Sequence, residues 1–304
     1  MIVSALPDGE LRRRLGGPGI RLRLGPVVAN IGSSFETVAS AIALHYCEHD
    51  VVPDTDFADF HVAVDPVRGL RRWIRPQAYF RFDASPPFNP LAANQAFPLL
   101  EWGLNWCISA HCHQFLIIHA AVVERGGHAL IMPAPPGSGK STLCAALVAR
   151  GWRLLSDELA LIDVETRRIT PVPRPISLKN ASIRIIGQFW RDAAMSPVVH
   201  DTLKGSVAHA RPPAASVKAA EQTAMPGWIV LPTFRAAEPM SLTLLAKSTA
   251  FMRLVESAFN YSVLGRRGFD ILADVVAASE CREFRYGGQL DEAVVAFDAL
   301  ARQR

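Results

Sequence analysis

The chain has 304 residues, of which half are apolar and a fifth are charged. This composition is typical of a folded globular protein and excludes an intrinsically disordered chain. The formal net charge of +4 suits anionic ligands but gives no argument for a nucleic-acid partner. The length is sufficient for one large domain or two ordinary ones, each with a sizeable core.

The cysteines and the N-terminus predict a cytoplasmic protein. Five cysteines show no paired spacing, and no charged, apolar and small-residue leader opens the sequence. We therefore expect reduced thiols. No apolar run reaches the length of about eighteen residues that a membrane span needs. The nearest, residues 102–123, contains three histidines, so we expect a buried helix followed by a buried strand and no membrane partner.

The first ninety residues combine short β-type runs with one clear helix. Residues 21–31 and 60–64 have strand composition, and apolar residues recur at helical spacing over residues 35–49. The proline cluster at residues 86–90 predicts a boundary. We therefore expect an N-terminal α+β domain over residues 1–90, a candidate for partner recognition, and a second domain over residues 91–304.

From Phe115 onward the pattern is that of an α/β nucleotide-binding core. A β-rich run, a Gly126–Gly127 turn and a second apolar run lead into a glycine-rich loop, which a helix and another strand follow. The runs are FLIIHAAVVE (115–124), HALIMPA (128–134), STLCAALVARG (141–151) and WRLLSDELALID (152–163). The last third predicts helices over residues 250–264 and 269–278, a strand over 281–286 and a helix from Asp291.

The glycine-rich loop fits the phosphate-binding pattern G-x-x-x-x-G-K-[ST] at seven of its eight positions, with Ala134 in place of the first glycine. Glycines allow a backbone that turns its N–H groups toward a phosphate, and the following helix adds its positive end. The lysine can bridge phosphates and the serine hydroxyl can ligate Mg²⁺. The predicted nucleotide-binding residues are Pro136, Gly137, Ser138, Gly139, Lys140, Ser141 and Thr142.

Two acids follow at the next strand, Asp157 and Glu158, the first of them seventeen residues beyond Lys140. One helix and one strand of this length return the chain to the side of the loop. One carboxylate can hold Mg²⁺ together with Ser141, and the other can accept a proton from an attacking hydroxyl. At a strand end or bulge both can face one cleft.

These segments together resemble HPr kinase/phosphorylase, and more specifically the HprK-related kinase A group. The stretch from His119 to about Leu178 carries the first resemblance, with a histidine before the loop hairpin, the loop and an acidic pair. Four further segments are similar to the related kinases: PRPISLKNASI, DTLKGSVAHARPP, FMRLVESAFNYSVLG and FRYGGQLDEAVVAFDAL. The implied fold is a P-loop kinase core of the HPr kinase/PEP carboxykinase-like type within the α/β class.

The resemblance implies roles for the matching positions. His119 would lie near the γ-phosphate, and Asp157 would act as the base toward a serine hydroxyl. Glu158 replaces a second aspartate of HPr kinase, so which acid is the base and which holds the metal stays open. We do not infer the reverse, phosphorylase reaction for this chain from the resemblance. A homo-oligomer is expected only by analogy with HPr kinase.

Cations on later loops are candidates to stabilise charge on the transferred group. Lys179 and Lys204 are predicted catalytic residues, although surface positions are as compatible with the sequence. Arg174, His209 and Arg211 are weaker candidates of the same kind.

We therefore predict an enzyme that uses ATP and Mg²⁺ to phosphorylate a serine hydroxyl of a peptide or small protein. Two alternatives stay open: a small-molecule kinase with the same core, and a nucleotide-binding regulatory module that does not turn over. The sequence does not identify the phosphoacceptor.

Overall fold

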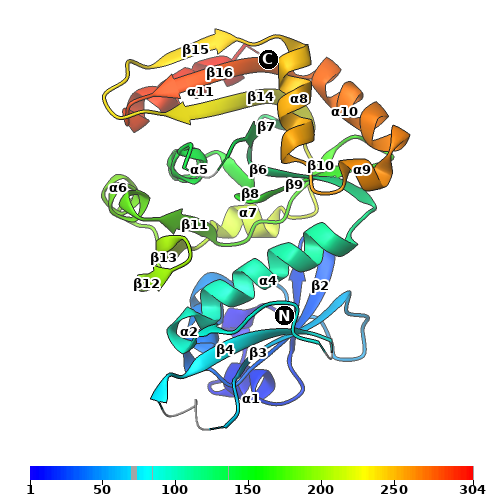
Figure 1. Cartoon of the computed structure of the whole chain (residues 1–304), viewed down its shortest axis with the longest axis vertical. Coiled ribbons are helices and arrows are strands. Elements are labelled where there is room, and N and C mark those ends of the chain that lie inside the picture. Colours follow the sequence, from blue (N-terminus) through cyan, green and yellow to red (C-terminus); the bar gives the residue numbers. More distant parts are fainter. Residues whose placement is uncertain (70–73, 84, 136, 304) are drawn as a thin grey trace.

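The computed structural model describes residues 1–69, 74–83, 85–135 and 137–303, which form an α/β fold with mixed sheets (Figure 1). A five-stranded sheet lies in the N-terminal part, a larger eight-stranded sheet in the C-terminal part, and a small three-stranded sheet beside them. The α/β class predicted from the sequence is confirmed.

The N-terminal sheet follows chain order, and its strands β2 and β3, which run parallel, are joined through helix α2. The helix predicted over residues 35–49 is α2 and ends four residues earlier, at His45. The elements of this part are η1 (Val3–Ala5), α1 (Glu10–Leu15), β1 (Ile20–Leu24), β2 (Val27–Ser33), α2 (Glu36–His45), β3 (Phe60–Pro66), β4 (Gln77–Phe82), β5 (Leu91–Ala92) and η2 (Ala93–Gln95).

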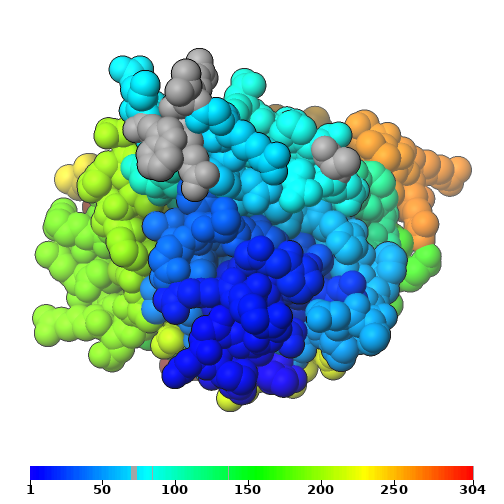
Figure 2. Space-filling view, turned by 90° about the horizontal axis from the view of Figure 1, so that it is seen from below, coloured from blue at the N-terminus to red at the C-terminus, as the bar shows by residue number. Residues whose placement is uncertain are grey.

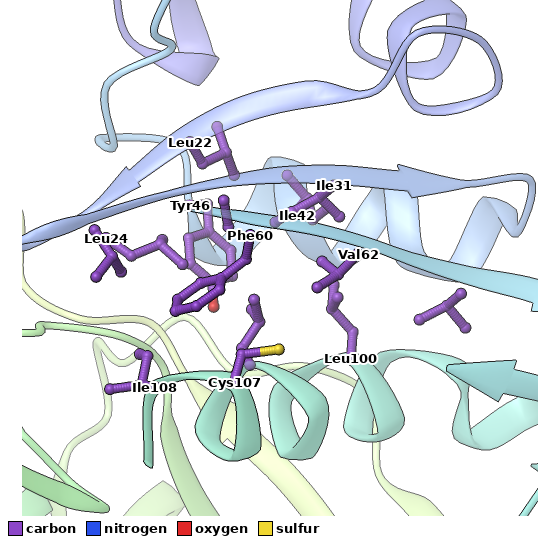
Figure 3. Close-up of a cluster of buried hydrophobic side chains, with 14 of the residues drawn as sticks. Leu22, Leu24, Ile31, Ile42, Tyr46, Phe60, Val62, Leu100, Cys107 and Ile108 are labelled. Carbon is purple, nitrogen blue, oxygen red and sulfur yellow. The ribbon is translucent and has the colours of Figure 1, made fainter. Parts of the chain in front are cut away.

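Helix α4 (Ala96–His111) closes the first core by packing on this sheet. Figure 3 shows its Leu100, Cys107 and Ile108 turned toward side chains of the strands and of α2, among them Phe60 and Val62. The predicted boundary near residue 90 therefore precedes a helix whose buried face belongs to the N-terminal core. Burial of these apolar side chains stabilises the packing by roughly 25 cal/mol per Å² removed from water.

The eight-stranded sheet is built around β6 (Phe115–Arg125), most of which is buried and apolar, as a central strand requires. The strand order is β10-β9-β6-β7-β14-β16-β15, with β8 also paired to β6. The other strands are β7 (His128–Pro133), β8 (Arg153–Ser156), β9 (Leu159–Asp163), β10 (Ile169–Thr170), β14 (Met225–Phe234), β15 (Ser241–Leu244) and β16 (Glu280–Tyr286).

Helices cover both faces of this sheet. One face packs against α5 (Lys140–Ala149) and α11 (Leu290–Ala301), and the other against α8 (Lys247–Ser257), α9 (Tyr261–Leu264) and α10 (Arg266–Ala278) (Figure 1). Helix α6 (Ala181–Phe189) packs outside α5, on the small sheet. Helix α7 (Ala214–Lys218) follows the small sheet of β11 (Ile176–Lys179), β12 (Val199–Thr202) and β13 (Gly205–Ala210). The alternation of buried residues along β6 between the two faces explains why helices are needed on each.

Two predicted elements are divided in the structure. The strand predicted over residues 152–163 is β8 and β9, which both run antiparallel to β6 and are separated by Asp157 and Glu158. The helix predicted over residues 250–264 is α8 and α9. Between them Ala258 forms a bridge to Ile118 of β6.

Buried polar contacts join the N-terminal part to the segment that leads from β10 into β11. Arg174 Nη2 donates to Glu101 Oε2 at 3.2 Å and to Asn105 Oδ1 at 2.8 Å, and Tyr46 donates to the other oxygen of Glu101 at 2.5 Å. His49 Nε2 lies 3.1 Å from the carbonyl oxygen of Pro173. The candidate cation Arg174 therefore belongs to this interface, where breaking a buried pair costs about 3–5 kcal/mol.

Seen from below, the N-terminal residues cover the centre of one face, and residues near 180–210 lie beside them (Figure 2). Within the described ranges no helix is long and apolar enough to cross a membrane.

Three buried histidines make this interface sensitive to acid. Burial lowers the pKa of His45 to about 4, of His49 to about 4 and of His209 to about 3. The unfolded chain binds these protons already below about 6.5, so stability present at neutral pH is lost as the pH falls toward 4. We expect the free energy of unfolding, measured by urea denaturation, to decrease by up to roughly 1.4 kcal/mol per pH unit for each histidine.

The matched variants are His45→Phe and His200→Phe. His45 already stacks on Phe97 and has no hydrogen-bond partner among the described residues, whereas His200 is exposed. His45→Phe should reduce the slope of the unfolding free energy against pH by the contribution of one histidine, and His200→Phe should leave this slope unchanged. Equal slopes for the two variants would contradict the assignment.

Candidate functional site

The glycine-rich loop leaves β7 at Pro133 and enters α5 at Lys140, as the sequence predicts. Gly137 and Gly139 have φ angles of +87° and +84°, values that favour glycine. A Cβ at residue 139 would overlap the hydroxyl of Tyr286, which donates a hydrogen bond to the Gly139 carbonyl oxygen at 3.0 Å. Pro136 lies outside the described residues, so its predicted role is left as a prediction.

Lys140 lies in an unusual environment. It is 7% exposed, and its Nζ atom has no hydrogen-bond partner among the described residues. Burial lowers its pKa, while the charges of Glu158 and Asp157 oppose that effect. The buried Ser138 hydroxyl likewise lacks a partner in this part of the chain. Because buried polar groups are nearly always paired, these two atoms indicate a site for an anion at the start of α5.

Glu158 connects β6, β11 and the loop side of the site. Its Oε2 lies 3.1 Å from His119 Nε2, and its Oε1 lies 3.5 Å from Lys179 Nζ. Burial opposes the charge of Glu158, but the His119 hydrogen bond and the Lys179 and Lys140 charges outweigh it and lower the pKa of the carboxyl group. Glu158 is therefore a permanent anion at neutral pH.

Asp157, the other member of the acid pair, is more deeply buried than Glu158. It is buried, its Oδ2 accepts a hydrogen bond from the Ser177 N–H at 3.0 Å, and its Oδ1 has no partner among the described residues. Burial, together with the neighbouring Glu158 charge, raises the pKa of Asp157 to about 6. The two adjacent carboxyl groups therefore differ strongly in proton affinity, which is typical of acid–base sites.

A cavity of about 660 Å³ lies between the loop and β11. Its lining includes His119, Glu158, Lys179, Lys204 and the loop residues 137–142, while Asp157 is not part of the wall. The structure thus brings together all the predicted site residues that it describes, with Asp157 directly behind them. Lys204 lies over the Trp102 ring at 5.0 Å, and burial followed by the Lys179 charge lowers its pKa.

The weaker candidates lie elsewhere. Arg211 Nη1 is 3.6 Å from Cys47 Sγ, and the buried His209 ring packs against Phe97, as part of the contact with the N-terminal domain. Neither residue lines the cavity.

Sequence reasoning missed three residues that shape the loop and the acid pair. Tyr286 and Phe234 lie on β16 and β14, and the Phe234 N–H donates to the Ser138 carbonyl oxygen at 3.1 Å. Ser177 contributes only its backbone N–H to Asp157. None had a local signal: Tyr286 and Phe234 reach the loop through the pairing of β16 with β14 and of β14 with β7, and Ser177 reaches Asp157 from a strand of the small sheet.

The donor set fits a magnesium ion bound together with phosphates. Mg²⁺ prefers oxygen ligands and is usually held by one or two carboxylates plus substrate phosphates. Ser141 and Glu158 both line the cavity and offer such oxygens. No group of three or more histidine, cysteine or acidic residues suited to an all-protein metal site occurs in the described ranges.

The contact between Gly139 and Tyr286 gives a test of the loop geometry. Gly139→Ala should lower the free energy of unfolding by more than Gly126→Ala, which has φ +61° but open space around it. The left-handed backbone alone costs about 1–2 kcal/mol, and only residue 139 adds an overlap. The combination with Tyr286→Phe should recover part of the loss in chemical denaturation. A Gly139→Ala cost no larger than that of Gly126→Ala would contradict this geometry.

No protein-family model matches the chain, and no curated protein matches it. The resemblance to HPr-kinase-related proteins therefore rests on the residues themselves and stays a prediction.

Proposed function

We propose that this protein is an ATP- and Mg²⁺-dependent kinase that transfers the γ-phosphoryl group to a serine hydroxyl of a peptide or small protein. The observation that carries the proposal is the buried ammonium of Lys140, which has no hydrogen-bond partner among the described residues and lies beside a cavity walled by His119, Glu158 and Lys179. An ammonium in this position needs an anion, and a nucleotide phosphate supplies one.

Each part of the nucleotide tail has a matching group. The backbone N–H groups from Gly137 to Ser141 and the N-terminal end of α5 would receive the phosphates, with Lys140 between the β and γ positions. Ser141 and Glu158 would hold Mg²⁺, which when bound neutralises charge on the phosphate oxygens. Lys179 and Lys204 would stabilise charge on the transferred group.

In the proposed transfer the serine oxygen bonds to the γ-phosphorus, the bond from that phosphorus to the bridging oxygen breaks, and ADP leaves. The serine proton passes to Asp157, whose pKa of about 6 suits a base at neutral pH. Glu158, held ionised by His119 and Lys179, suits the metal better than the proton. Because Asp157 lies behind the cavity wall, its Oδ1 must become accessible when nucleotide and acceptor bind, as catalytic contacts often tighten only in the complex.

The type of core is part of the proposal. The antiparallel β6–β7 hairpin leading into the loop and the pairing of His119 with Glu158 support the HPr kinase/PEP carboxykinase-like resemblance. The joint presence of the loop lysine, the acid pair and two further lysines favours turnover over a purely regulatory nucleotide site.

Lys140→Ala should weaken ATP binding at least tenfold, measured by titration with a fluorescent ATP analogue, because no other described cation occupies the same buried position. Lys218→Ala, at an exposed residue of α7, is the matched control and should bind as the unaltered chain does. Equal affinity of the two variants would remove the basis of the proposal.

The pH dependence of the rate and substitution of each acid distinguish the proposed roles of Asp157 and Glu158. If Asp157 is the base, the rate of transfer falls about tenfold per pH unit below about 6, because the protonated carboxyl cannot accept a proton. Asp157→Asn should lower kcat by about 10²–10⁴-fold and remove this acid limb.

Glu158→Gln should mainly raise the Mg²⁺ concentration needed for half-maximal rate. Initial rates across pH and Mg²⁺ concentration measure both effects. The opposite pattern, with kcat lost in Glu158→Gln and retained in Asp157→Asn, would exchange the two roles.

A further inference from the structure

Phe259 is an exposed aromatic side chain next to the proposed phosphate site. It is 51% exposed, although large apolar side chains are normally buried. Its ring centroid lies 6.0 Å from that of His119, whose Nε2 contacts Glu158. None of the roles assigned so far uses Phe259.

The structure holds Phe259 firmly in this position. Asn260 is buried, and its side chain accepts a hydrogen bond from the Ile117 N–H at 2.9 Å and donates one to the Phe115 carbonyl oxygen at 2.8 Å. The Phe259 N–H donates to the Ile117 carbonyl oxygen at 2.9 Å. A segment fixed by three hydrogen bonds to the central strand presents an aromatic ring at low conformational cost.

The β6 edge explains why this ring lies near the loop. Strand β7 pairs with β6 up to Pro133 opposite Ala120, and the chain then leaves as the phosphate-binding loop. Ala258 takes the next place on β6, as a bridge to Ile118. The loop and the Phe259 segment are therefore consecutive neighbours of β6. Side chains alternate along such a segment, which turns Phe259 to the face of His119.

A second exposed apolar side chain flanks the cavity. Leu203 lines it and is 88% exposed, in the turn that also carries Lys204. The charged groups of the site act on one another: the two carboxylates of the acid pair offset two of the three lysines (Lys140, Lys179 and Lys204), and a bound magnesium–nucleotide would leave a small excess of negative charge. This negative charge disfavours acidic residues beside the acceptor serine, whereas the exposed side chains of Phe259 and Leu203 favour apolar ones.

We propose that Phe259 is a specificity-determining residue that packs against an apolar side chain flanking the acceptor serine of a peptide, with Leu203 as a second apolar contact. This inference rests on the proposed kinase function and specifies its acceptor: a peptide segment with leucine-like residues next to the serine. The contribution of one such contact is about tenfold in kcat/KM, the usual range for a small apolar group in an apolar site.

The test uses the full chain, Mg²⁺, γ-labelled ATP and a library of short peptides with a central serine and varied flanking residues. Labelled product should be enriched in peptides with apolar flanking residues. For the preferred peptide, Phe259→Ala should lower kcat/KM about tenfold without changing the KM for ATP, and Phe259→Leu should restore most of the loss. The matched control is Phe269→Ala, because Phe269 on α10 is equally exposed at 51%.

The outcomes distinguish this inference from the proposed function. Failure of the unaltered chain to bind ATP would remove the proposed function and this inference with it. If the chain binds ATP, three results would overturn the inference alone. These are a preference for acidic flanking residues, the absence of transfer to any library peptide, and equal kcat/KM values for Phe259→Ala and Phe269→Ala. Dissociation of a dimer by Phe259→Ala in sedimentation experiments would also overturn it, because the ring would then contact a second copy.

Discussion

The buried ammonium of Lys140 is the constraint on which the rest of the site depends. A charged group removed from water is costly unless it is paired, and the described residues offer its Nζ atom no hydrogen bond. The nearby charges of Glu158 and Asp157 partly compensate. A lysine kept in this state at the start of a helix, beside backbone N–H groups, is the basis for the proposal that the site receives an anion.

The central sheet accounts for how the loop and the acids meet. Strand β6 pairs with β7 on one side, from which the loop departs, and with β8 and β9 on the other, between which the acid pair lies. The loop is then supported from the far side by Tyr286 and Phe234 of the parallel strands. Side chains on rigid strands are positioned more accurately than side chains on free loops, which suits the proposed phosphoryl transfer.

The N-terminal part of the structure, including α4, also contributes to the acid pair through one short segment. Pro173 and Arg174 are held by His49 and Glu101, and three residues further on the Ser177 N–H holds Asp157. The Lys179 side chain, at the end of the same strand, reaches Glu158. This contact therefore continues into the site, so the N-terminal part contributes to the geometry of the site as well as to the core of the molecule.

The sequence by itself determined the features that depend on local chemistry. The loop glycines, Lys140, the following helix and the acid pair are read from residue types at fixed spacing, because backbone conformation and helix ends depend on neighbouring residues. Only the tertiary structure decided which acid faces the cavity, that α4 packs on the N-terminal sheet, and that Tyr286, Ser177 and Phe259 surround the site. These relations join residues far apart in the chain, and their physical cause is strand pairing and burial, which leave no local pattern to read.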